Sequence, residues 1–158
     1  MLEDEAEASQ RTGGRRAWLD VCKGRTNRST GARVPGEVEV VDGELRFTVV
    51  EREHGRKERL AVQRLGDERA LGQMLGPEPL VLRFALGDVT LAFPKVPGGR
   101  SLIRIRAEGR PKVFVTFLDL GVIMRTSPYR LLWHALSRGP AARRERDALR
   151  AEIERAQG

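Results

Sequence analysis

Cysteine and histidine are scarce in this chain of 158 residues. Its single cysteine, Cys22, excludes a disulfide within the chain and a cysteine-cluster zinc site. The two histidines, His54 and His134, fall in a predicted turn and a predicted helix, and neither has a nucleophile with a supporting carboxylate nearby. The sequence also has no phosphate loop, no GxGxxG and no HExxH motif. We therefore expect no enzyme, no metal site and no cofactor.

Long hydrophobic runs are missing as well. No stretch approaches the roughly 20 apolar residues of a membrane-spanning helix. The first ten residues, MLEDEAEASQ, are acidic and lack the apolar centre of a secretory signal peptide. These features predict a cytoplasmic protein. The balance of 40% hydrophobic and 32% charged residues is typical of a soluble globular domain and not of a disordered chain.

Lysine is rare although the net charge is +7, because arginine supplies almost all of the cations. Such an excess fits either an anionic partner or a compositional bias that serves solubility, and both interpretations stay open. Aromatic residues make up only 5% of the chain, and most occupy core-facing positions of predicted strands. Sequence-specific nucleic-acid binding is therefore disfavoured, since it usually relies on exposed aromatic rings for stacking.

Alternating apolar residues are the strongest positive signal, above all between Leu80 and Leu118. A period of two indicates antiparallel strands with one face on a core and the other in water. Gly87-Asp88 is interpreted as a hairpin turn, and the glycines and prolines of 94–99 as a loop between two hairpins. This segment predicts an antiparallel β block.

A second meander is predicted earlier in the chain, around the hairpin turn Asp42-Gly43. Its strands are expected at Glu37 to Val41 and Glu44 to Arg52, with a third at Lys57 to Arg64. Residues 66–76 are ambiguous and include a candidate helical turn. A weaker first strand is expected at Trp18 to Lys23.

The C-terminal region predicts two helices. Ser127 and Pro128 are a suitable start for an amphipathic helix that ends at Arg138, because Gly139-Pro140 is a strong stop signal. Residues 141–157 predict a second, highly charged helix with a thin apolar stripe of Leu149 and Ile153, which is expected to pack weakly. The expected organisation is a disordered tail (1–17), a β-barrel-like domain with a capping helix (18–139) and a charged helix (140–158).

The best candidate binding feature is a basic loop predicted at Gly24 to Gly36. It contains no acidic residue, and its cations could form charge-assisted hydrogen bonds to phosphate oxygens. The alternative is a solvated loop whose arginines contact nothing. The expected ligand-binding residues are Lys23, Arg25, Arg28 and Arg33, and a second basic stripe is expected on the outer sheet face at Arg83, Arg104 and Arg106.

Strands in meanders followed by an amphipathic helix with Trp133 to Leu136 resemble the pleckstrin-homology (PH)-like superfold. The resemblance covers residues 18–138 and implies a mainly β fold (α+β): a small bent β-sandwich or barrel, plugged by its helix, with ligands against a basic first loop. A second resemblance is to PilZ domains, which bind cyclic di-GMP through RxxxR and [DN]xSxxG motifs. Arg11 and Arg15 match the first motif, whereas Asn27 to Gly31 is one residue short of the second.

The sequence thus favours a non-enzymatic binding or adaptor module that contacts an anionic partner through its arginine-rich loop. The expected partner is a phosphorylated ligand, an acidic lipid surface or an acidic protein. Two alternatives remain: an assembly protein that docks a partner through its C-terminal helix, and a degenerate cyclic di-GMP receptor. The oligomeric state does not follow from the sequence.

Overall fold

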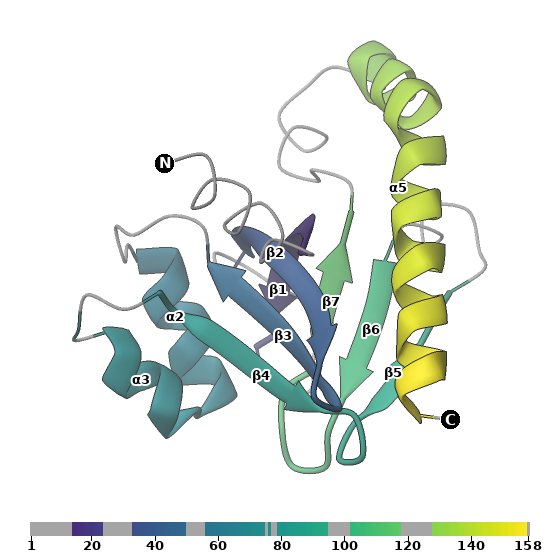
Figure 1. The fold of residues 1–158 in the computed structure, drawn as a ribbon. Helices are drawn as coiled ribbons and strands as arrows, with labels where there is room; N and C mark the ends of the chain where they lie inside the picture. Colours follow the sequence, from purple (N-terminus) through teal and green to yellow (C-terminus); the bar gives the residue numbers. More distant parts are fainter. Residues whose placement is uncertain are drawn as a thin grey trace, which may run out of the picture.

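A computed structural model describes residues 14–23, 33–49, 56–74, 76, 79–94, 102–117 and 128–157, with side chains of the last helix described from Gly139 onward. Seven strands and three helices lie in these ranges (Figure 1). In chain order they are β1 (Arg15–Val21), β2 (Arg33–Val41), β3 (Glu44–Val49), α2 (Arg56–Leu65), α3 (Glu68–Met74), β4 (Val81–Ala85), β5 (Thr90–Ala92), β6 (Leu102–Arg106), β7 (Val113–Thr116) and α5 (Pro128–Gln157).

The strands form one antiparallel sheet in the order β4-β3-β2-β1-β7-β6-β5. Two meanders, β1 to β4 and β5 to β7, are joined by the pairing of β1 with β7. The predicted class, mainly β with a C-terminal helix, is confirmed, and the sheet is curled like a half-barrel (Figure 1). The predicted Asp42-Gly43 turn is also confirmed, since both residues have positive φ, 52° and 72°.

The turn at Gly87-Asp88 is not the hairpin that the sequence predicted. It joins β4 and β5, which stand at opposite edges of the ladder and pair with β3 and β6 instead of each other. Ala85 and Thr90 are separated by a chain of at most about 18 Å, so the sheet must curl until its two edges approach. The Leu86 N–H donates to the Gly43 carbonyl oxygen at 3.0 Å and fixes this corner to the β2–β3 turn.

Alternate residues of the strands point into one hydrophobic core. Leu19 of β1, Val38 of β2, Phe47 of β3 and Ile103 of β6 are completely buried. Most of their neighbours along each strand are half-buried, as the period of two predicted, whereas Asp20 beside Leu19 is buried. The inward phase of the β block was therefore correctly assigned.

The strand predicted at Lys57 to Arg64 is wrong, because this segment forms the helix α2. Its buried residues are Glu58, Ala61, Val62 and Leu65, which have the spacing of one helix face. The alternation that suggested a strand rested on Leu60 and Val62 alone. The helical turn considered for residues 66–76 is confirmed as α3, whose first N–H groups are capped by Asp67: its Oδ1 accepts the Ala70 N–H at 3.1 Å.

The two C-terminal helices predicted from the sequence are one continuous helix, α5, with Pro140 inside it. The thin stripe packs tightly: Ala142, Leu149 and Ile153 are at most 4% exposed and belong to the main core. This burial offsets the single backbone hydrogen bond that Pro140 removes. The expectation that residues 141–157 pack weakly is wrong, and the helix is continuous across the boundary drawn at 139–140.

Polar contacts also attach α5 to the end of β5. The Nη1 of the buried Arg146 donates to the Pro94 carbonyl oxygen at 2.6 Å. The guanidinium carbon of Arg150 lies 4.7 Å from the centre of the Phe93 ring. At the other end of the described chain, β1 begins at Arg15, inside the segment expected to be a tail. None of the helices described is long and apolar enough to cross a membrane.

Candidate anion-binding site

The candidate site lies at the end of β1, where four segments meet: β1, β2, the β6–β7 turn and α2. β1 runs between β2 and β7, so residues after Val21 lie next to the start of β2 and the β6–β7 turn. The Cys22 N–H donates to the Lys112 carbonyl oxygen at 2.9 Å and extends the ladder by one bond. From α2, the Arg64 Nη1 donates to the Val21 carbonyl oxygen, also at 2.9 Å.

Arg33 and Asp20 form an ion pair within this site. They are direct cross-strand partners, and the Arg33 Nε lies 3.2 Å from the Asp20 Oδ1. The Asp20 side chain is only 5% exposed, whereas that of Arg33 is 26% exposed. A buried carboxylate needs such a partner, because an uncompensated charge in this position would be strongly destabilising. Arg33 therefore has a structural task in addition to any binding role.

Positive charge predominates around the end of β1. Lys23, Arg33, Arg64 and Lys112 come from four different segments, and the buried carboxylate of Asp20 lies among them as the partner of Arg33. Charges of both signs act on the pKa of the nearby Cys22 thiol. Burial raises this pKa, the charge of Asp20 raises it further, and the charges of Lys112 and Arg64 lower it. Cys22 is completely buried, so it is a core residue and not a reactive thiol.

The expected binding residues are therefore brought together only in part. Lys23 is exposed at the end of β1, and Arg33 lies within β2, because β2 already begins at Arg33, inside the segment predicted as a loop. Arg25 and Arg28 lie outside the described residues. Sequence reasoning missed Arg64, because its segment was interpreted as a strand, and Lys112, which the pairing of β1 with β7 brings next to Cys22.

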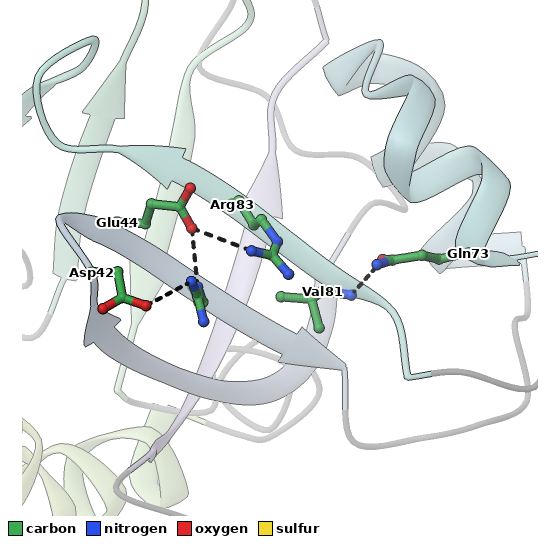
Figure 2. A network of polar contacts seen from close by, with 6 residues as sticks. Asp42, Glu44, Gln73, Val81 and Arg83 are labelled. Carbon is green, nitrogen blue, oxygen red and sulfur yellow. Dashed lines mark hydrogen bonds and ion pairs between the residues drawn. The ribbon is translucent and has the colours of Figure 1, made fainter.

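The second basic stripe predicted from the sequence is not a single surface. Arg83 lies on β4 and Arg104 and Arg106 on β6, with four strands between them in the sheet. Arg83 faces Arg46 across the strands, and the Glu44 carboxylate bridges the two (Figure 2). Its Oε2 is 3.0 Å from the Arg46 Nε and 3.5 Å from the Arg83 Nη1.

A cavity of about 430 Å³ lies between β4, the α2–α3 junction and the β6–β7 turn. Its base is apolar and includes Leu65, Phe84 and Ile105, whereas its rim carries both signs, with Arg69 and Arg110 beside Asp88 and Glu108 among others. This mixed charge favours no ionic ligand class. Within the part of the chain that the structure describes, no cluster of three His, Cys, Asp or Glu residues could hold a metal ion.

Comparison with known proteins identified no relative of this chain. No family model, no curated protein and no solved structure matches the chain.

Proposed function

We propose that this protein is a non-enzymatic binding module that contacts an anionic partner at the end of β1, through Lys23, Arg33, Arg64 and Lys112, together with Arg25 and Arg28, which follow Lys23 in the sequence. The observation that carries the proposal is that four cationic residues from four segments meet at the end of β1: Lys23 follows β1, Arg33 pairs with Asp20, Arg64 donates to the Val21 carbonyl oxygen, and the Lys112 carbonyl oxygen accepts the Cys22 N–H. Residues far apart in sequence gather here, which a uniform compositional excess of arginine does not require.

The architecture supports the further proposal of a PH-like module. A curled seven-stranded antiparallel sheet, two consecutive meanders and a final helix packed on the core agree with the resemblance in the sequence. In that superfold, ligands often lie against a basic first loop, and the segment between β1 and β2 has that position here. A phosphorylated ligand fits the site best, because guanidinium and ammonium groups both form charge-assisted hydrogen bonds to phosphate oxygens.

A thermal-shift screen tests the proposal. The purified protein is melted with inositol phosphates, nucleotides, cyclic dinucleotides and inorganic polyphosphate, at low and at moderate salt. A ligand at about a hundred times its dissociation constant adds roughly 2.7 kcal/mol of stability, so a rise of several degrees is expected. A rise with cyclic di-GMP alone would favour the PilZ alternative, and one that disappears in moderate salt would indicate diffuse charge only.

Variants locate the site. Lys23→Gln with Lys112→Gln should abolish the shift, while Arg33 is left intact so that Asp20 keeps its partner. The matched control is Arg143→Gln with Arg144→Gln, which removes the same charge from exposed positions of α5 and should leave the shift unchanged. Deleting residues 141–158 is no useful test of the assembly alternative, because it would remove Leu149 and Ile153 from the core.

A further inference from the structure

The outer face of β1, β7 and β6 forms a surface separate from the core. Ala17, Leu19, Val115 and Ile103 point into the core, so the residues between them along each strand point outward. The buried hydrophobic residues of α2, α3 and α5 belong to the core cluster, which places these helices on the inner side of the sheet. On this outer face Arg16 and Arg106 are exposed and Trp18, Arg104 and Phe114 are half-buried, whereas Asp20 and Thr116 are buried.

Two aromatic residues lie on this face, Trp18 on β1 and Phe114 on β7. Trp18 is registered with Thr116 and Phe114 with Asp20, so the two rings are diagonal neighbours on adjacent strands. Both residues are half-buried. The expectation that most aromatics occupy core-facing positions, which argued against nucleic acid, does not apply to these two residues.

Arginines surround the aromatic pair. Arg104 is the direct cross-strand partner of Phe114, and Arg106 is exposed two residues further along β6. The guanidinium carbon of Arg16 lies 5.7 Å from the centre of the Trp18 ring. Among the described residues no carboxylate forms an ion pair with any of these three arginines. Two acids lie on the same outer face: Glu37 of β2 is the direct cross-strand partner of Arg16, and Asp20 forms an ion pair with Arg33.

We propose that this face, which we call the β1–β7–β6 platform (Arg16, Trp18, Arg104, Arg106 and Phe114), binds single-stranded nucleic acid. Unpaired bases stack on Trp18 and Phe114, while the arginines contact the phosphates on either side. Stacking accepts every base, so the binding is tolerant of sequence. A duplex is excluded as the preferred ligand, because its bases are already stacked on each other and offer no free face.

The platform is distinct from the anion site proposed above, although the two lie on the same strands. It requires two aromatic rings, which a phosphorylated small molecule does not, and it includes none of Lys23, Arg33, Arg64 or Lys112. An acidic peptide would contact the arginines but would gain nothing specific from the rings. The aromatic residues are therefore the feature that identifies the partner class.

Fluorescence anisotropy with a labelled oligonucleotide of about 12 nucleotides tests the proposal. The aromatic variants are Trp18→Leu and Phe114→Leu, because leucine retains an apolar side chain at each half-buried position while removing the ring. Each should weaken binding about tenfold, the loss expected for one stacked base. A duplex of the same length should bind more weakly than the single strand, and a poly-glutamate peptide should not compete.

Charge variants test the same surface while leaving the half-buried aromatic residues unchanged. Arg104→Gln with Arg106→Gln should reduce the slope of log affinity against log salt by about 1.4, that is about 0.7 for each lost phosphate contact. The control, Arg143→Gln with Arg144→Gln on α5, should leave the slope unchanged. If the platform pair and the α5 control pair reduced the slope equally, binding would depend on diffuse charge and the proposal would be overturned. Full binding by both leucine variants would also overturn it.

Failure of this proposal can be told apart from failure of the anion site. If Lys23→Gln with Lys112→Gln abolishes oligonucleotide binding while the platform variants bind normally, the platform is overturned and the anion site holds the strand. If the platform variants lose the oligonucleotide but keep the thermal shift with a phosphorylated ligand, both proposals are supported. No binding of the intact protein to the single strand at about 50 mM salt overturns the platform alone.

Discussion

Arg15, the first residue of β1, holds two carboxylates of the C-terminal helix at once. Its Nη1 lies 2.7 Å from the Oε2 of Glu145 and its Nη2 lies 3.1 Å from the Oε1 of Glu152. The two glutamates are seven residues apart, two turns along one face of α5, so both nitrogens of the planar guanidinium are used. The contact joins segments 130 residues apart in the chain and fixes the helix along the sheet.

Arg15→Gln should weaken the attachment of α5. The three side chains are between 27% and 47% exposed, so solvent reduces the strength of the pairs and the expected loss is about 1 kcal/mol. Thermal unfolding should show a fall in Tm of about 3 °C, and the fall should shrink in high salt. Arg143→Gln, at an exposed position of the same helix, is the control and should leave Tm unchanged.

Gly36 is a position where any side chain would collide with backbone. A Cβ there would lie 2.3 Å from the Thr48 carbonyl oxygen and 2.6 Å from the Phe47 ring on the neighbouring strand. Gly36→Ala should therefore destabilise the protein by about 3 kcal/mol, the upper range for overpacking. Gly72→Ala, in α3 where a Cβ meets nothing within 4 Å, should instead stabilise it by about 0.5 to 1 kcal/mol. Urea unfolding measures both, and equal stabilities would contradict the close packing of β2 on β3.

Gly36 also shows how far the sequence predicts this fold. Local alternation is a property of the strand itself, so the inward phase of β3, β6 and β7 could be predicted without knowing their neighbours. The glycines and proline of residues 24–36 were interpreted as a loop, whereas β2 already begins at Arg33 and needs Gly36 to approach β3 closely. That requirement comes from a neighbouring strand, and composition alone does not reveal it.

Longer-range relationships were least predictable. Gly139-Pro140 locally favours the end of a helix. The burial of Leu149 and Ile153 against the sheet outweighs this preference, so the helix continues. The candidate site depends on which strands are neighbours: Lys112 joins Lys23 only because β7 pairs with β1. Trp18 and Phe114 likewise become neighbours through that pairing, so their shared outer face could not be recognised from either strand alone.

Gln73 of α3 accepts a hydrogen bond from one outward-facing backbone N–H of the edge strand β4. Its Oε1 accepts the Val81 N–H at 3.1 Å, a group that points away from β3 (Figure 2). Gln73→Ala should cost about 1 kcal/mol, the net value of one such hydrogen bond. Gln63→Ala, at an exposed position of α2, is the control and should change stability little. Hydrogen exchange should show faster exchange of the Val81 amide in Gln73→Ala than in the intact protein, and unchanged protection would refute the capping role.

Glu44 makes the stability of the β2–β3–β4 face depend on pH. The hydrogen bond from Arg46 is the largest influence that lowers the pKa of the Glu44 carboxyl from its ordinary value of 4.5, and Arg83 acts in the same direction (Figure 2). A carboxyl with a lowered pKa contributes stability above its unfolded pKa, and that contribution is lost as pH falls through the folded value.

The variant Glu44→Gln removes the charge that lies between two arginines registered opposite each other. Its Tm should therefore be lower than that of the intact protein at neutral pH, and the difference should shrink as pH falls below the ordinary value of 4.5. Glu108→Gln, at an exposed carboxylate in the β6–β7 turn, is the control and should show no such convergence. A difference in Tm that stays constant from neutral to acidic pH would mean that Glu44 acts through packing and not through its charge.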